Sequence, residues 1–246
     1  MRGHLTAPAR TSQPSSRGPV RDSGPPGDPA TRILYRDDRL LVLDKPAGLP
    51  VHRGPRGGAS LEDWLPSLAL GKRRLPQPAH RLDADTAGCL ALGRTKPALA
   101  ALGALFAAGR VGKTYWAVVR GAPPQPEGEI AAPLLKRSSM SEGWRIVVDP
   151  AGQPALTAWR VLGQGDGLSW LELRPRTGRT HQLRVHCAHL GCPILGDARY
   201  GGGEGPLHLL ARSLSLPLDP PVNATAPPPP HMRAALSACG WRKGAA

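Results

Sequence analysis

Residues 80–88 of the chain read HRLDADTAG. The stretch places two acids, Asp83 and Asp85, directly after a segment that is basic at Lys72, Arg73, Arg74 and Arg81. Neighbouring positive charge keeps a carboxylate ionised. An ionised carboxylate in a basic groove suits a nucleophile, whereas the general acid of a glycosidase-like pair needs a proton. The stretch therefore predicts a catalytic loop, with a plain turn as the alternative.

The segments around this loop predict several strands. Residues 33–48 have the pattern of a β-hairpin that ends at Lys45-Pro46, and residues 88–94 that of a short strand. Further strands are expected at 112–121, at 155–163 and 168–175 with a turn at 164–167 between them, and at 207–216 as the last strand.

Helices are predicted at four places. Ser60 with Asp63 marks one helix start, and Thr95 and Gly109 bracket a second helix. Residues 180–191 form the third, with inward-facing residues at Leu183, His186, Cys187 and Leu190, and a short helix follows the proline run of 226–230. Since strands and helices do not alternate as in βαβ units, we expect an α+β fold around a mixed, largely antiparallel β-sheet with flanking helices.

The domain organisation is predicted from composition. Residues 1–30 contain six Pro and four Gly, with Leu5 and Val20 as the only large aliphatic side chains. Such a segment cannot bury enough apolar surface to offset its ordering entropy, so a disordered tail is expected. Residues 31–246 are expected to form one domain.

The charge of the chain indicates the kind of partner, and its cysteine content indicates the cellular compartment. The net charge is +14, of which residues 1–30 carry only +2, so a polyanionic partner is expected: nucleic acid first, an anionic membrane surface second. Four scattered cysteines without a CxxC pair suggest a reducing compartment, and we expect the cytoplasm. The sequence has no apolar run of 18 residues and no secretory apolar segment at its start, so no membrane association is expected.

A second basic segment lies downstream. Residues 173–196 contain no acid and carry Arg174, Arg176, Arg179 and Arg184. A helix beginning near Arg179 or Thr180 would direct its amides and these guanidiniums at one anion. The alternatives are a solvated basic face and a metal site built from His181, His186, Cys187, His189 and Cys192, whose spacing matches no familiar zinc pattern. No HExxH, GxSxG, P-loop or GxGxxG motif is present.

Four blocks together resemble the RluA-type pseudouridine synthases. They are LDKPAGLPVH (43–52), HRLDADTAG (80–88), GKTYWAVVRG (112–121) and TGRTHQLRVHCAHLGCPILGDARYG (177–201), in that family's order and spacing. The resemblance covers about residues 33–216. It implies the pseudouridine synthase fold with a central basic catalytic cleft, and an enzyme that isomerises uridine to pseudouridine in RNA.

The resemblance also implies roles for single residues. Asp83 is the catalytic residue, Tyr115 lies under the target base, and Arg184 pairs with the catalytic carboxylate. Arg81 takes part in displacing the target nucleotide. Asp85 falls at a variable position and receives no role. The remaining pocket residues that we expect to bind substrate are Thr86, Arg179, Thr180, His181 and Gln182, with Thr177 beside them.

The implied reaction neither adds nor removes an atom, so no cofactor and no metal are expected. The expected partner is ribosomal or transfer RNA; no obligatory protein partner is evident, and a monomer is expected. Two departures stand out: Ala87 replaces the family's usual Ser, and residues 1–30 are too short for the RNA-binding S4 domain of many relatives. The alternatives are a catalytically silent RNA-binding protein of the same fold, and a glycosidase or nucleoside hydrolase, which would not need the +12 of the main domain.

Overall fold

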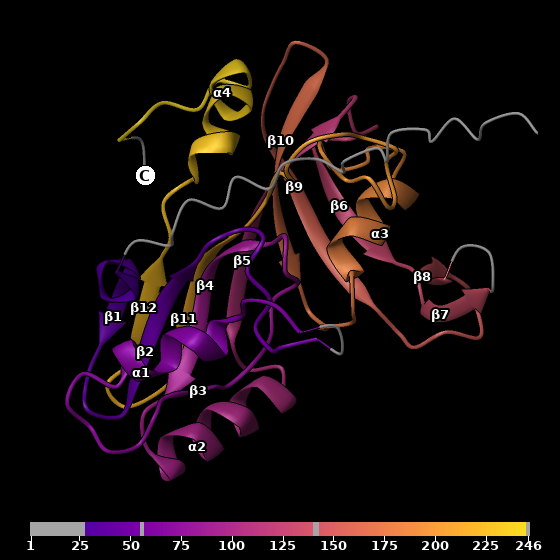
Figure 1. The fold of residues 1–246 in the computed structure, drawn as a ribbon. Coiled ribbons are helices and arrows are strands. Elements are labelled where there is room, and N and C mark those ends of the chain that lie inside the picture. The colour runs from indigo at the N-terminus through magenta and orange to yellow at the C-terminus, as the bar shows by residue number, and fades with distance from the viewer. Residues whose placement is uncertain (1–27, 55–56, 140–142, 245–246) are drawn as a thin grey trace, which may run out of the picture.

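A computed structural model describes residues 28–54, 57–139 and 143–244 (Figure 1). Most of the predicted tail lies outside these residues. Its last three residues belong to the folded part, because Asp28 caps a 3₁₀ helix, η1 (Pro29–Arg32), by accepting a hydrogen bond from the Ala30 N–H. The described structure thus begins three residues before the predicted boundary.

One ten-stranded sheet organises the molecule. Its main path runs β1-β2-β4-β11-β5-β10-β9-β6, with β12 beside β11 and β3 beside β4. Within the described ranges every pair in it is antiparallel except β4–β11, which confirms the predicted mixed, largely antiparallel sheet. The strands are β1 Ile33–Arg36, β2 Leu40–Lys45, β3 Gln77–Pro78, β4 Ala87–Gly93, β5 Gly112–Arg120, β6 Glu127–Ala131, β9 Leu156–Gly165, β10 Leu168–Pro175, β11 Leu209–Leu216 and β12 Val222–Thr225.

A separate two-stranded hairpin, β7 (Leu134–Ser139) and β8 (Gly143–Val148), extends from the sheet near α3 (Figure 1). The sequence did not predict this hairpin, nor β3, β6 and β12. The strand at 207–216 was wrongly expected to be the last, because β12 follows it and pairs with it. Most of these strands are short or mostly exposed and lack the apolar alternation that reveals a half-buried strand. β12 does alternate between buried and exposed residues, but over only four positions.

The described residues form five helical segments after η1, two of which begin at their predicted caps. They are η2 Leu61–Trp64, α1 Leu65–Leu68, α2 Lys96–Ala107, α3 Gln182–His189 and α4 Pro230–Ala238. Asp63 accepts from the Ser60 N–H at 2.9 Å, and the Thr95 hydroxyl accepts from the Ala98 N–H at 3.3 Å. Gly109 follows α2 with a φ of 65°, as expected of a residue that closes a helix. In the described part of the chain, no helix has the length and apolarity that crossing a membrane requires.

Helices cover both faces of the β2–β4 part of the sheet. Leu41, Leu43, Leu90 and Leu92 pack in one cluster with η2 and α1, while the alternate residues Leu40, Val42 and Ala91 pack in another with α2 and α4. All seven residues of β4 are buried in consequence. On the other half of the sheet, Leu183 and Cys187 of α3 pack against Leu171 and Leu173 of β10. The segments that lead into β4 and into α3 carry the predicted site.

Close backbone contact fixes the start of β4. Gly88 has a φ of 108°, and a Cβ atom there would lie 2.3 Å from the Ala211 carbonyl oxygen of β11. The parallel register pairs Ala87 with Leu210 and Gly88 with Ala211. Only glycine permits both this φ and this approach. The HRLD loop therefore ends where the backbone is closely packed in the middle of the sheet.

Candidate active site

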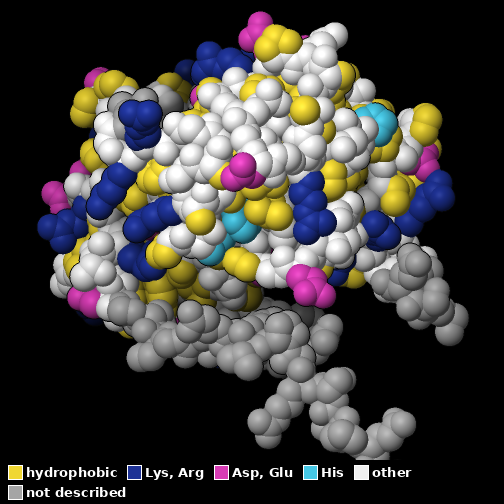
Figure 2. Space-filling view, turned by 90° about the horizontal axis from the view of Figure 1, so that it is seen from above, with side chains coloured by type: hydrophobic (Ala, Val, Ile, Leu, Met, Phe, Trp, Pro, Cys, Tyr) yellow, Lys and Arg dark blue, Asp and Glu magenta, His cyan; other side chains and the backbone are white. Residues whose placement is uncertain are grey.

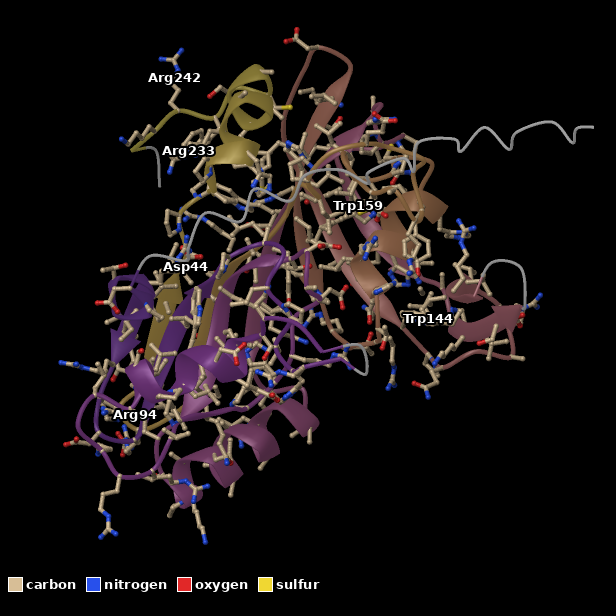
Figure 3. All side chains as sticks on the ribbon, in the orientation of Figure 1. Asp44, Arg94, Trp144, Trp159, Arg233 and Arg242 are labelled. Carbon is tan, nitrogen blue, oxygen red and sulfur yellow. The ribbon has the colours of Figure 1, made fainter. Side chains whose placement is uncertain are left out.

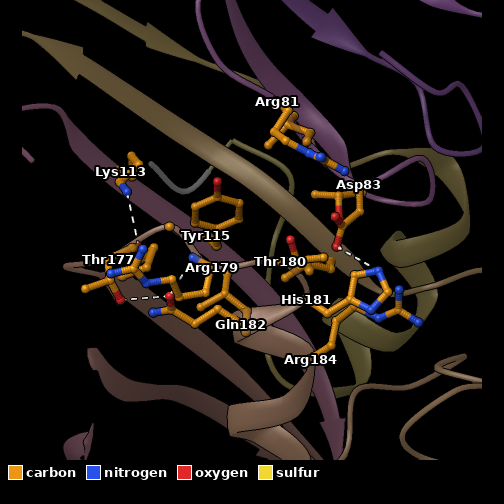
Figure 4. A pocket seen from close by; sticks show the side chains of 16 residues that line it. Arg81, Asp83, Lys113, Tyr115, Thr177, Arg179, Thr180, His181, Gln182 and Arg184 are labelled. Atoms are coloured by element: carbon orange, nitrogen blue, oxygen red, sulfur yellow. Dashed lines mark hydrogen bonds and ion pairs between the residues drawn. The ribbon is translucent and has the colours of Figure 1, made fainter. Parts of the chain in front are cut away.

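The two predicted segments meet in one open pocket (Figure 4). Sixteen of the described residues line it, and they include all nine residues that the sequence assigned to the site: Arg81, Asp83, Thr86, Tyr115, Arg179, Thr180, His181, Gln182 and Arg184. Asp83 is the one acid among these sixteen, beside the basic residues Arg81, Lys113, Arg179 and Arg184.

A buried lysine, Lys45, is hydrogen-bonded to the backbone of the HRLD loop. Lys45 is fully buried, and its Nζ donates to the carbonyl oxygens of Pro46 at 2.8 Å, Leu49 at 2.8 Å and Ala84 at 2.9 Å. Burial lowers the pKa of Lys45 to about 7, against the opposing charges of Asp85 and Asp83. Since Ala84 follows Asp83 directly, Lys45 fixes the backbone that carries the candidate catalytic residue.

Replacing Lys45 with Met should test this support. The aliphatic stem is retained, but the Pro46 and Leu49 carbonyls lose the donor. An unsatisfied buried polar group costs about 1–3 kcal/mol. We expect the free energy of unfolding, measured by urea denaturation, to fall by about this amount. An unchanged unfolding midpoint would contradict the role of Lys45.

Asp83 lies at the opening of the pocket. Its side chain is 20% exposed, and its Oδ2 lies 3.9 Å from Nε2 of His181 (Figure 4). The neighbouring Asp85 is exposed and does not line the pocket, in agreement with its having no assigned role. Thr86 is buried, and its N–H donates to the Asp83 carbonyl oxygen at 3.1 Å, which closes the turn. The plain-turn interpretation of the loop is therefore also correct as a description of its backbone.

Tyr115 reaches the pocket from β5. Burial, and then the charge of Asp83, raise the pKa of the Tyr115 phenol above its usual range. The ring is neutral and offers an apolar face beside the carboxylate. Lys113, two residues earlier on the same side of β5, also lines the pocket and approaches the Thr177 carbonyl oxygen at 3.4 Å. Sequence reasoning missed Lys113, although the period of two that places Tyr115 in the pocket also applies to it.

Gln182 organises the segment before α3. Its Oε1 accepts from the Thr177 hydroxyl at 2.8 Å and from the Arg179 N–H at 3.0 Å, and its Nε2 donates to the Leu156 carbonyl and the Thr157 hydroxyl. The amide of Gln182 is thus fully engaged inside the protein. Arg179 and Thr180 are exposed and remain directed to solvent at the pocket.

The structure gives Arg184 a second acidic partner that the sequence did not predict. Its Nε and NH2 donate to both oxygens of Asp197, at 2.8 and 2.7 Å. Against the effect of burial, the charge of Asp83 also acts on Arg184 and raises its pKa together with Asp197, without a hydrogen bond between Asp83 and Arg184. The Arg184 side chain is 8% exposed and that of Asp197 is 0% exposed. Burial acts in the opposite direction, but the Arg184 hydrogen bonds and charge hold the pKa of Asp197 below its usual range. The sequence argument ended its acid-free stretch at Gly196, one residue before this partner.

The His and Cys residues of the metal alternative serve other purposes. His186 is fully buried, with Nδ1 2.9 Å from the Thr157 hydroxyl and Nε2 3.0 Å from the Ala132 carbonyl oxygen. Burial raises the pKa of the Cys187 thiol. Within the ranges that the structure covers, no three His, Cys, Asp or Glu side chains gather as metal ligands. His186 and Cys187 therefore belong to the core.

Exposed basic side chains lie at the pocket itself. Figure 2 shows one face of the molecule, on which further Lys and Arg side chains are scattered. Two exposed arginines line the pocket: Arg81 from the loop before β4 and Arg179 from the segment before α3. This arrangement favours a phosphate-rich partner.

Comparisons with known proteins give the family. The family model described as RNA pseudouridylate synthase matches residues 39–189. An uncharacterised RNA pseudouridine synthase of Zymomonas mobilis is 45% identical over 207 residues, covering 81% of this chain and 94% of that protein. A mitochondrial RNA pseudouridine synthase of Arabidopsis thaliana is 41% identical over 69% of this chain, which spans only 40% of the plant protein.

Solved structures support the same family. The human RNA pseudouridylate synthase domain containing protein 4 superposes with a TM-score of 0.74 at 31% identity, covering 86% of this chain and 94% of that one. Its counterpart, domain containing protein 1, gives 0.70 at 29% identity. The α+β architecture predicted from the sequence is confirmed as the pseudouridine synthase fold. The chain belongs to the RNA pseudouridylate synthase family, isomerases that modify uridine in RNA.

Proposed function

We propose that the protein isomerises specific uridines in RNA to pseudouridine with Asp83 as its catalytic residue and without a cofactor. The observation that carries the proposal is the position of Asp83. It is the one acid among sixteen lining residues, it is partly exposed, and four basic residues line the same pocket. A carboxylate in such a place is accessible to a bound nucleotide and is surrounded by cations.

The chemistry explains why one carboxylate suffices. The glycosidic N1–C1′ bond breaks, the uracil rotates while it is held, and a C5–C1′ bond forms. The product has the same atoms as the substrate and no electrons are gained or lost. Asp83 acts at the ribose, either by attacking C1′ or by accepting a proton from the sugar. Neither route requires a redox group, a nucleotide triphosphate or a metal ion.

The pocket geometry suits a base that has left its stack. Extruding a nucleotide from a helix costs a few kcal/mol. Tyr115 supplies an aromatic ring beside Asp83, on which the extruded uracil stacks. Arg81, exposed at the opening next to Asp83, occupies the place that the base vacates. Lys113 and Arg179 bind the phosphates of the flanking nucleotides.

One relative supports a ribosomal substrate. The ribosomal large subunit pseudouridine synthase D of Zymomonas mobilis is 36% identical over 77% of this chain. We therefore propose ribosomal RNA as the first candidate substrate, with transfer RNA as the second. A monomer as the active form is a separate proposal. A mapping of pseudouridines in RNA from cells with and without the gene identifies the position. RNA binding without any uridine conversion would instead support a catalytically silent RNA-binding protein.

Salt should weaken RNA binding steeply. Each phosphate contact releases counterions, so the logarithm of affinity falls linearly with the logarithm of salt concentration. With several basic residues around the pocket, we expect a slope of about −3 to −5 between ~50 and ~200 mM salt. Fluorescence anisotropy of a labelled RNA measures it. A slope near zero would show that the basic surface does not contact phosphates.

A further inference from the structure

The ring of His181 is held at one nitrogen by a tyrosine outside the pocket lining. Nδ1 of His181 lies 2.8 Å from the hydroxyl oxygen of Tyr200. That oxygen also accepts a hydrogen bond from the Ile146 backbone N–H, at 3.3 Å. The two rings are nearly perpendicular, with centroids 5.6 Å apart. The Tyr200 hydroxyl is thus the link between the β8 backbone and His181.

Counting donors assigns the proton positions in this link. A phenol has one proton to donate, and the backbone N–H of Ile146 can only donate. If Tyr200 donates to Nδ1, every group in the chain has a partner. If Nδ1 carried the proton instead, it and the Ile146 nitrogen would both donate to the phenol oxygen, and the half-buried Tyr200 hydroxyl would have only solvent to donate to. The arrangement in which Nδ1 accepts and Nε2 carries the ring proton is therefore the one that pairs every group within the protein.

Nε2 of His181 faces the candidate catalytic residue, Asp83. Nε2 is 3.9 Å from Asp83 Oδ2, and Figure 4 shows the ring edge directed at this oxygen. The distance exceeds that of a hydrogen bond. In proteins without bound substrate such contacts are often long and shorten when the substrate is bound. In the described part of the chain, no hydrogen bond to another side chain involves the Asp83 carboxylate.

We propose that His181 is a positioning residue whose Nε2–H, fixed by Tyr200 and the Ile146 N–H, holds Oδ2 of Asp83 and leaves Oδ1 to react. The proposal rests on the catalytic role of Asp83 given above. When a donor holds Oδ2, the carboxylate cannot rotate, and Oδ1 stays directed at the ribose. Displacement by about 1 Å costs up to about 100-fold in rate.

The charge state of the ring agrees with this assignment. Burial, with the charges of Arg184 and Arg199, lowers the pKa of His181 against the opposing effect of Asp83 and Asp197. The imidazole is therefore neutral near pH 7 and carries a single N–H, so the tautomer decides which nitrogen donates.

Hydrogen bonds between β8 and the segment before Tyr200 also stabilise this link. Arg145 of β8 donates to the Arg199 carbonyl at 2.8 Å, and Arg199 donates to the Trp144 carbonyl at 2.9 Å. The Trp144 ring, labelled in Figure 3, belongs to the turn end of the hairpin, and its centroid lies 5.1 Å from that of the His181 ring. These contacts hold β8 and the segment before Tyr200 together, so the hydroxyl cannot easily leave Nδ1.

Two substitutions at His181 separate a donor role from a backbone role. His181→Gln places an amide N–H near the position of Nε2, whereas the shorter Asn reaches only the position of Nδ1. The φ of His181 is 53°, a left-handed conformation that Asn adopts more readily than Gln. If the donor matters, Gln retains most of the single-turnover rate and Asn loses about 10- to 100-fold, with unchanged RNA affinity. If Asn is as active as Gln or more active, the donor role is overturned.

The tautomer itself can be observed without catalysis. In ¹⁵N-labelled protein, the two-bond ¹⁵N–¹H correlations of His181 should show Nδ1 without a proton and Nε2 with one. Tyr200→Phe removes the donor, so a mixture of tautomers and a lower turnover rate at unchanged RNA affinity are expected. A proton on Nδ1 in the unsubstituted protein overturns the inference. Because this measurement does not depend on activity, it remains decisive if Asp83→Asn proves active, a result that would contradict the proposed function instead.

Discussion

Replacing Asp83 with Asn should lower the single-turnover rate of pseudouridine formation by about 10⁴-fold or more, as loss of a unique reacting group does in well-studied hydrolases. Asn is nearly isosteric with Asp, so the loop and the pocket should be preserved. An amide can neither attack the ribose nor accept its proton as a carboxylate can. RNA affinity should be retained within about twofold, since phosphate contacts supply most of it.

Asp85→Asn is the matched control for this experiment. It removes the same charge two residues away, but Asp85 is exposed and does not line the pocket. It should keep most of the activity. Conversion is measured by chemical mapping of pseudouridine, and binding is followed separately. An active Asp83→Asn variant, or an inactive Asp85→Asn variant, would remove Asp83 from the centre of the site.

Arg184→Met should cause the largest loss of stability that we expect from one substitution. It leaves the Asp197 carboxylate, which is 0% exposed, without its cation. Breaking a buried ion pair by removing one partner costs about 3–5 kcal/mol. Two backbone N–H groups, of Arg199 and Tyr200, still donate to Asp197 at 3.0 and 3.1 Å and reduce the loss only partly. Urea denaturation measures the free energy of unfolding.

Two further variants test whether the unpaired Asp197 carboxylate causes the loss of stability. Arg160→Met breaks a pair with Glu172 in which the arginine is 52% exposed, and should cost no more than about 1 kcal/mol. Adding Asp197→Leu to Arg184→Met removes the unpaired charge and should restore part of the stability. If Arg184→Met is as stable as Arg160→Met but loses activity, Arg184 serves Asp83 after all, as the family resemblance first implied.

Much of the fold could be predicted because the deciding signals are local. The hairpin of β1 and β2, the caps of α2 and the turn between β9 and β10 each depend on a few neighbouring residues, such as Thr95 or Asp166-Gly167. The missed strands depend on distant partners instead. β6 reads EGEIA and pairs with β9 at the sheet edge, where only Ile130 is buried. The five residues of β6 alone do not indicate that they form a strand at the edge of a sheet.

The site could be predicted to the same extent and for the same reason. Residues 81–86 and 177–184 form compact blocks, so their members were found together. The supporting residues were missed because they act across the fold. Lys45 contacts Ala84 from 39 positions away, and Tyr200 reaches His181 from 19 positions away. Their importance follows from hydrogen bonds that only the folded chain creates.

Gly88 bears on how a target uridine reaches Asp83. At this residue two strands lie so close that a Cβ atom would be 2.3 Å from the Ala211 carbonyl oxygen, so the end of the loop is packed against the centre of the sheet. If Asp83 acts as proposed, most of the displacement on binding falls to the nucleic acid. A uridine that is already unpaired or mismatched needs the least work to arrive there. We therefore expect the protein to prefer uridines that leave their helix easily, in addition to any preference for base sequence.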